Sequence, residues 1–198
     1  MAFKVNANNI AIENMTVTNR TPVGGSQAEA LMIETGAARF ILNNANVGSF
    51  QDTLLANVNS SQGYFYNSLI EGQFDYIWGG GNLFFTNCEL RTLLGNNGST
   101  TGGNLTAART DNGATGNWPG YGGLLASNGF SFVNCQLTRV TNTITSTTLA
   151  DSNGTTNGVV AWINCSFDAN YILPAVGVLN SQLSVSYTHL DVYKRQGL

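Results

Sequence analysis

The chain has 198 residues, of which 42% are hydrophobic and only 10% are charged, and its formal net charge is −3. This charge argues against nucleic-acid binding, which requires a basic patch, and no apolar run reaches the roughly 18 residues needed to span a membrane. Asn, Ser, Thr and 23 glycines supply the remaining polarity, a mixture that favours an all-β protein with many turns. We therefore expect one β-domain that binds neither nucleic acid nor membrane.

Six segments of the chain share one pattern, in which apolar residues flank a central asparagine. In chain order they are AIENMTV (11–17), ILNNANV (41–47), YFYNSLI (64–70), FFTNCEL (84–90), SFVNCQL (131–137) and AWINCSF (161–167). Their asparagines are Asn14, Asn44, Asn67, Asn87, Asn134 and Asn164. All but one of the intervals fit the roughly 20–30 residues of a solenoid repeat, and no convincing helix-period stretch separates the segments. The pattern predicts a parallel β-helix in which each repeat forms one coil.

The repeat also predicts how particular residues lie. The longest interval, from Asn87 to Asn134, contains loop-like sequence and leaves room for a further coil around NLTAART (104–110). The aligned asparagines are expected to bond backbone groups or neighbouring asparagines at a turn between strands. Cys88, Cys135 and Cys165 share one repeat position and are expected to form a buried internal stack, because cysteine buries as a small apolar residue. A disulfide within this stack stays open, whereas a ladder offers poor geometry for a metal.

Two aspartates stand out in this charge-poor chain. The interval between Asp52 and Asp75, and that between Gln27 and Gln51, each correspond to about one coil. Coils stack about 4.8 Å apart, which predicts that the four side chains meet on the outer face of three successive coils. Two such carboxylates should not both ionise readily, which leaves one anionic nucleophile or base beside one protonated acid. Neighbouring amides suit an oxyanion, while turn aspartates and solvent-facing glutamines are the structural alternative.

These residues stand in blocks that resemble those of the pectin methylesterases (pectinesterases), which are right-handed parallel β-helices. The blocks are SQAEAL (26–31), QDTL (51–54), GQFDYIWG (72–79) and NLTAARTD (104–111). The resemblance covers about residues 3–180 and implies hydrolysis of the methyl esters of galacturonate units in pectin, without metal or cofactor. It implies that Asp75 is the nucleophile, that Asp52 acts as acid and then base, and that Gln27 and Gln51 form the oxyanion hole.

One block of that family is not matched. The family has a Leu-Gly-Arg-Pro-Trp block whose Arg binds the nucleophilic aspartate, whereas the corresponding region, 146–165, contains LADSNG (149–154) with neither Arg nor Trp. Arg109 is the candidate substitute, and Trp78 is a candidate sugar contact with core packing as its alternative. The departure keeps open a non-catalytic β-helix that binds polysaccharide. A third function is a glycoside hydrolase, which also uses paired carboxylates, but its inverting form needs carboxyls about 6.5–9.5 Å apart, further than adjacent coils would place them.

The end of the chain differs in composition from the rest. SVSYTHLDVYKRQ (184–196) contains the only His and no Gly or Asn, and 185–196 read as a translation of the inverted mosaic-end sequence of transposase-based sequencing libraries. We therefore expect residues 1–183 to form a partial β-helix domain and residues 184–198 to be a non-native tail. The start of the chain lies inside a strand-like pattern, so we expect a piece of a longer protein. We further expect that its source is a bacterial metagenome and that the protein is secreted and monomeric.

Overall fold

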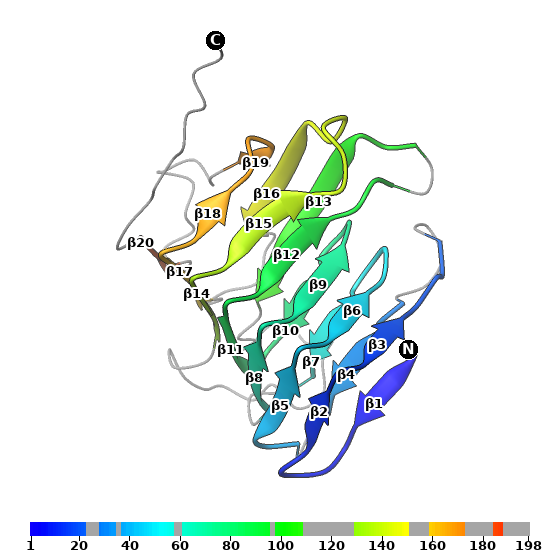
Figure 1. Ribbon diagram of the computed structural model, residues 1–198, viewed down its shortest axis with the longest axis vertical. Helices are drawn as coiled ribbons and strands as arrows, with labels where there is room; N and C mark the ends of the chain where they lie inside the picture. Colours follow the sequence, from blue (N-terminus) through cyan, green and yellow to red (C-terminus); the bar gives the residue numbers. More distant parts are fainter. Residues whose placement is uncertain are drawn as a thin grey trace, which may run out of the picture.

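The computed structural model describes residues 1–22, 28–34, 37–57, 61–95, 98–108, 129–150, 159–172 and 184–187. Its strands form three parallel sheets, here called A, B and C, which extend along one common axis (Figure 1). The chain visits sheets A, B and C in turn and then begins the next coil. This arrangement confirms the predicted fold, a right-handed parallel β-helix, and within the described residues there is no α-helix.

The strands are short, and each sheet collects one strand from every coil. Sheet A contains β1 (Phe3–Val5), β4 (Leu31–Ile33), β7 (Leu54–Ala56), β10 (Ile77–Gly79), β13 (Thr101–Ala108), β16 (Ser146–Ala150) and β19 (Tyr171–Ile172). Sheet B contains β2 (Ala11–Glu13), β5 (Phe40–Asn43), β8 (Gln62–Tyr66), β11 (Asn82–Thr86), β14 (Gly129–Val133), β17 (Val159–Ile163) and β20 (Ser184–Tyr187). Sheet C contains β3 (Thr16–Thr18), β6 (Asn46–Gly48), β9 (Leu69–Gly72), β12 (Glu89–Thr92), β15 (Gln136–Arg139) and β18 (Ser166–Phe167).

The repeated asparagine forms the bend between sheet B and sheet C. All six asparagines of the repeat have φ between 48° and 55°, a left-handed conformation that Asn adopts more readily than most residues. Their side chains also bond along the stack, since Asn44 Nδ2 donates to Asn14 Oδ1 at 2.6 Å and Asn164 Nδ2 donates to Asn134 Oδ1 at 2.6 Å. The prediction of turn asparagines that bond their neighbours is confirmed.

The interior of the solenoid is built from columns of equivalent side chains. On sheet B, rings stack from coil to coil, with centroids 4.5 Å apart for Phe65 and Phe85, 4.6 Å for Phe85 and Phe132, and 4.1 Å for Phe132 and Trp162. Each buried ring of this kind contributes about 1.5–3 kcal/mol of stability by leaving water. Columns of this kind explain why the apolar residues of the repeat recur at fixed positions.

The three cysteines form another internal column. Cys88, Cys135 and Cys165 are buried and free, and the pairing of β12 with β15 and of β15 with β18 places them directly after one another in the stack. The predicted buried stack is confirmed. A hydrogen bond with Cys135 and burial together raise the pKa of the Cys165 thiol.

The prediction of a further coil within the longest repeat interval is wrong. β13 is the sheet A strand of the same coil that continues into β14 and β15, so the segment around 104–110 adds no further coil between Asn87 and Asn134. The extra length lies in connections of a single coil, before β13 and between β13 and β14. Loop insertions of this length are compatible with a solenoid because they leave the stacked strands unchanged.

Part of the segment expected to be a non-native tail continues the sheet. β20 pairs with β17 in parallel register, with Ser184 opposite Val159 and Tyr187 opposite Trp162. A free edge strand presents unpaired backbone groups that any alternating segment can satisfy. The pairing therefore follows from the edge of β17 and does not bear on the origin of residues 184–198.

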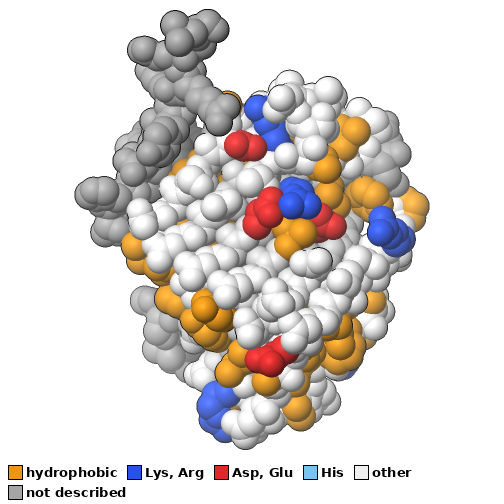
Figure 2. Space-filling model, in the orientation of Figure 1, with side chains coloured by type: hydrophobic (Ala, Val, Ile, Leu, Met, Phe, Trp, Pro, Cys, Tyr) orange, Lys and Arg blue, Asp and Glu red, His pale blue; other side chains and the backbone are white. Residues whose placement is uncertain are grey.

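The face shown in Figure 2 carries few charges, and those near its centre, on sheet C, form a group of both signs. In this group, Arg91 lies 2.9 Å from Glu89 and 3.6 Å from Glu71, and Glu89 also accepts a hydrogen bond from Thr138 Oγ1 at 2.6 Å. These residues come from β9, β12 and β15. Their side chains tie three successive coils together on the surface, and exposed pairs of this kind contribute at most about 1 kcal/mol each.

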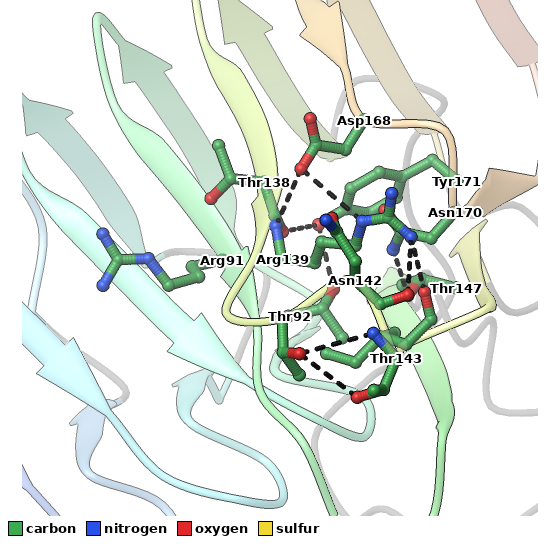
Figure 3. A network of polar contacts seen from close by, with 12 residues as sticks. Arg91, Thr92, Thr138, Arg139, Asn142, Thr143, Thr147, Asp168, Asn170 and Tyr171 are labelled. Atoms are coloured by element: carbon green, nitrogen blue, oxygen red, sulfur yellow. Dashed lines mark hydrogen bonds and ion pairs between the residues drawn. The ribbon is translucent and has the colours of Figure 1, made fainter.

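A second polar network joins the last described coils (Figure 3). Tyr171 Oη donates to the Thr138 carbonyl at 2.7 Å and shares a 2.9 Å bond with Thr92 Oγ1, while Asn170 Nδ2 donates to Thr147 Oγ1 at 2.9 Å. Burial raises the pKa of Tyr171 to about 12. The network connects β12, β15 and β16 to β19, so it ties the C-terminal coils together beside the apolar core, against which Tyr171 also packs.

Candidate active site

The two aspartates occupy equivalent bends between sheet C and sheet A. Asp52 lies two residues before β7 and has φ 54°, and Asp75 lies two residues before β10 and has φ 45°. Asp is one of the few residues whose short polar side chain tolerates this left-handed conformation. The bend turns the chain sharply into sheet A and places both carboxylates at the same edge of that sheet.

Strand register places Asp52 and Asp75 next to each other. Leu54 of β7 pairs with Ile77 of β10, and each aspartate lies two positions before its member of this pair. The backbone is paired up to this point, because the Asp52 amide donates to the Phe74 carbonyl at 3.0 Å and the Leu54 amide donates to the Tyr76 carbonyl at 2.9 Å. The prediction that they are neighbours on adjacent coils is confirmed.

The surroundings of the two carboxylates differ. Asp52 is 4% exposed, whereas Asp75 is half-buried and accepts a hydrogen bond from Asn104 Nδ2 at 3.0 Å. Asn104 belongs to the next coil and is the register equivalent of Asp75, since Ile77 pairs with Thr106. Burial disfavours a charged carboxylate, while a donated hydrogen bond favours it. The site is therefore asymmetric in burial and in hydrogen bonding, since Asp52 is almost fully buried and Asp75 is half-buried beside an amide donor.

A third carboxylate lies on the other side of Asp52. Leu31 pairs with Leu54, and Glu29 precedes Leu31 just as Asp52 precedes Leu54, so Glu29 is the coil equivalent of Asp52. Glu29 is 7% exposed and lies 4.0 Å from the amino group of Met1. Sequence reasoning missed both Glu29 and Asn104. The interval between the two aspartates, counted back from Asp52, would have found Glu29, but the insertion before β13 changes the interval for Asn104.

The structure places one of the two candidate oxyanion residues. Gln51 is half-buried, forms an isolated parallel bridge with Phe74, and directly precedes Asp52. Gln27 lies outside the described residues. The register between β4 and β7 makes Ala28 the coil equivalent of Gln51, so the spacing of the two glutamines does not coincide with the strand register.

Trp78 packs on the outer face of sheet A. It is 2% exposed and forms a small apolar cluster with Leu55, Ala107 and Met32, apart from the main core. These four residues are register equivalents on four successive strands. The geometry favours packing over a direct sugar contact for Trp78. The residue after it, Gly79, has φ 110°, and a Cβ there would collide with the Ala56 carbonyl.

The remaining candidate residues fall wholly or partly outside the described part of the chain. Arg109 and the part of LADSNG from 151 to 154 lie outside the described residues, and β16 ends at Ala150, which pairs with Thr106.

Tyr76, which follows Asp75, points into the core, where burial raises its pKa well above the usual value. Within the described ranges, no three His, Cys, Asp or Glu side chains are grouped closely enough to hold a metal ion.

The fold and the site define a class: parallel β-helices with paired aspartates on adjacent coils of one sheet. The profile of the Pectinesterase family matches residues 1–150, and the chain belongs to the pectinesterase family. It is 34% identical over 89 residues to a pectinesterase of Sitophilus oryzae, covering 43% of this chain and 23% of that protein. It is 32% identical over 124 residues to putative pectinesterase 11 of Arabidopsis thaliana, covering 63% of this chain and 29% of that protein.

Solved structures show the same fold. A pectin methylesterase from carrot superimposes with a TM-score of 0.69 at 15% identity, over 93% of this chain and 55% of that one. A pectin methylesterase from Yersinia enterocolitica gives a TM-score of 0.67 at 22% identity, over 86% of this chain and 58% of that one. The chain thus spans about a quarter of the length of the curated relatives named above and somewhat more than half of these structures.

Proposed function

We propose that this chain carries the active site of a pectinesterase, which hydrolyses the methyl esters of galacturonate units in pectin. The observation that supports this most directly is the asymmetric pair of aspartates on adjacent coils. Asp75 accepts a hydrogen bond from Asn104 and is half-buried, whereas Asp52 is almost fully buried. Two like groups in different surroundings divide the roles of nucleophile and acid at one pH.

The proposed reaction uses both carboxyls in two steps. A carboxylate oxygen of Asp75 attacks the ester carbonyl carbon, the bond to the methoxy oxygen breaks, and that oxygen takes the proton of Asp52 and leaves as methanol. An anhydride then joins Asp75 to the galacturonate. Asp52, now ionised, takes a proton from water as the water attacks this anhydride, which releases the galacturonate acid and restores both aspartates. Covalent catalysis of this kind divides a difficult hydrolysis into two easier steps.

Other residues receive supporting roles in this proposal. Gln51, which directly precedes Asp52 at the site, and Gln27 would donate to the oxyanion that forms in both steps. Trp78 and Arg109 would serve the substrate side, Trp78 by shaping the outer face of sheet A and Arg109 by its charge. We further propose that the whole protein is a secreted monomer that needs no cofactor. In the described part of the chain no helix is long and apolar enough to cross a membrane.

The experiment is an assay of the chain with methylated pectin. Methanol release with acidification is expected, and unmethylated polygalacturonate should give neither. Asp75→Asn should lower the rate by at least about 10³-fold, because the nucleophile is lost, while Asn57→Ala, a change at the other end of β7, should leave the rate nearly unchanged. New reducing ends without methanol would instead indicate a glycoside hydrolase, and pectin binding without turnover would indicate a binding protein.

A further inference from the structure

We infer that Asn104 is a positioning residue for the nucleophile: its side-chain amide orients the Asp75 carboxylate and holds it in the ionised form. This inference rests on the proposed function, because it assigns Asp75 the role of nucleophile. The observation that carries it is the hydrogen bond from Asn104 Nδ2 to Asp75 Oδ1 at 3.0 Å, between side chains on adjacent coils.

The local backbone is shaped to bring Asn104 to this position. β13 pairs with β16 through Thr101 opposite Ser146 and Asn104 opposite Thr148, so β13 contains one extra residue between these pairs. An extra residue of this kind forms a β-bulge, which re-aims the side chains beside it. The bulge falls directly before Asn104, in the stretch that contains Gly102 and Gly103.

Gly103 allows β13 to approach the aspartate bend closely. Its amide donates to the Gln73 carbonyl at 2.8 Å, and a Cβ at this position would collide with the ring of Phe74. Phe74 and Gln73 directly precede Asp75. The glycine and the bulge therefore act together, since one permits the close contact between the coils and the other turns Asn104 toward Asp75.

The chemistry of the amide fits the role of a positioning group. Asn104 Nδ2 is a neutral donor, and an ionised aspartate accepts hydrogen bonds only, so the bond favours the carboxylate over the acid. It also fixes the orientation of the carboxylate at Oδ1, and misplacement of an attacking group by about 1 Å can lower a rate up to about 100-fold. Asp52 lies one coil further from Asn104, so this amide acts on Asp75 and not directly on Asp52.

The test compares Asn104→Ala with a matched control, Asn57→Ala. Asn57 Nδ2 also donates to a carboxylate on a neighbouring coil, Glu34 Oε2, at 2.8 Å, but at the opposite end of β7. Asn104→Ala should lower kcat/KM by about 10- to 100-fold and move the acidic limb of the pH–rate profile to higher pH. Asn104→Asp should move it further in the same direction through like-charge repulsion, and Asn104→Gln should restore part of the rate. Asn57→Ala should leave the profile in place.

A second measurement separates this inference from the proposed function. The carboxyl of Asp75 can be titrated by carbon NMR in the parent chain and in Asn104→Ala, without substrate. Its titration should move to higher pH when the amide is removed. If the titration and the pH–rate profile are both the same in the two proteins, Asn104 does not position Asp75. If the titration moves but no methanol is released by the parent chain, the inference on Asn104 stands as a carboxylate-holding contact and the proposed function fails.

Discussion

Two series of bends in this solenoid use the same left-handed backbone but different residues. Every coil that carries the repeat turns from sheet B to sheet C at an asparagine, whereas the turns from sheet C to sheet A before β7 and β10 use Asp52 and Asp75. Both residue types tolerate this conformation, so backbone geometry does not explain the aspartates. An amide both donates and accepts, so asparagines can bond along a row as Asn44 and Asn14 do.

Ionised carboxylates cannot form such a row, because they only accept hydrogen bonds. The column of coil equivalents at the start of sheet A runs from Glu29 through Asp52 and Asp75 to an amide donor, Asn104, and the register continues it to Thr148. Asparagine would suit the left-handed backbone at Asp52 and Asp75 equally well and could bond along the column. The comparison therefore separates bends that stabilise the solenoid from bends that carry chemistry, and exchanging their residues tests this separation.

The largest expected effect comes from placing asparagine, the residue of the sheet B to sheet C bends, at the catalytic bend of Asp52. Asp52→Asn keeps a residue that suits φ 54° but removes the proton donor, so kcat should fall by about 10²–10⁴-fold. The thermal midpoint should stay nearly unchanged. Methanol release and circular dichroism measure the two quantities, and a double variant with Asp75→Asn should be little slower than Asp75→Asn alone, because residues that act as a unit are non-additive.

The next effect tests whether the structural bends depend on backbone conformation. Asn44→Ala places a residue with a disfavoured left-handed conformation at φ 48°, which costs about 1–2 kcal/mol. Asn44→Gly removes the bond to Asn14 but tolerates the backbone, so it should cost about 0.5 kcal/mol. Urea unfolding measures both. Equal losses for Ala and Gly would show that the side-chain bond, and not the backbone, matters at this bend.

The reciprocal exchange places an aspartate in the structural row. In Asn44→Asp the amide that donates to Asn14 Oδ1 at 2.6 Å is replaced by an oxygen, so an attraction becomes a repulsion between acceptors. Because the site is exposed, the loss should be only about 0.5–1 kcal/mol in unfolding free energy, and methanol release should not change. A fall in activity comparable to that of Asp52→Asn would contradict the separation of the two kinds of bend.

A further effect concerns stability at alkaline pH. Burial raises the pKa of Tyr171 to about 12 from an ordinary value of 10.0, so the unfolded chain loses this proton at lower pH than the folded chain. Its stabilising contribution is intact below pH 10 and is lost as the pH rises toward 12. Tyr171→Phe should flatten this decline in thermal midpoint, and at neutral pH it should cost about 1 kcal/mol through the lost bonds to Thr92 and Thr138. An unchanged alkaline decline would assign it to other groups.

Much of the solenoid can be predicted from sequence because similar residues recur along the chain at intervals of about one coil. The asparagine bends, the cysteine column and the adjacency of Asp52 and Asp75 all follow from counting along the chain between equivalent positions. Counting fails where a coil changes length. The insertion before β13 makes the interval from Ile77 to its partner Thr106 longer than that from Leu54 to Ile77. This change hides Asn104, and together with the long connection between β13 and β14 it suggests a further coil that is absent from the described strands.

The candidate site is harder to predict than the coil, since it depends on which way a side chain faces. Trp78 follows Ile77 in the same strand, yet one packs on the outer face and the other in the core. The bulge in β13 leaves no signal in the sequence beyond two glycines, Gly102 and Gly103. These features depend on contacts between coils. Where coils differ in length, the strand register is needed to show which residues meet.

The column of cysteines gives the molecule three built-in reporters along its axis. Cys88, Cys135 and Cys165 belong to three successive coils and are each at most 3% exposed, so a thiol reagent can reach one only when its coil opens. In a solenoid each coil contacts only its neighbours, and opening can begin at one end and propagate. The order in which the three thiols are modified would therefore record the direction in which the stack comes apart.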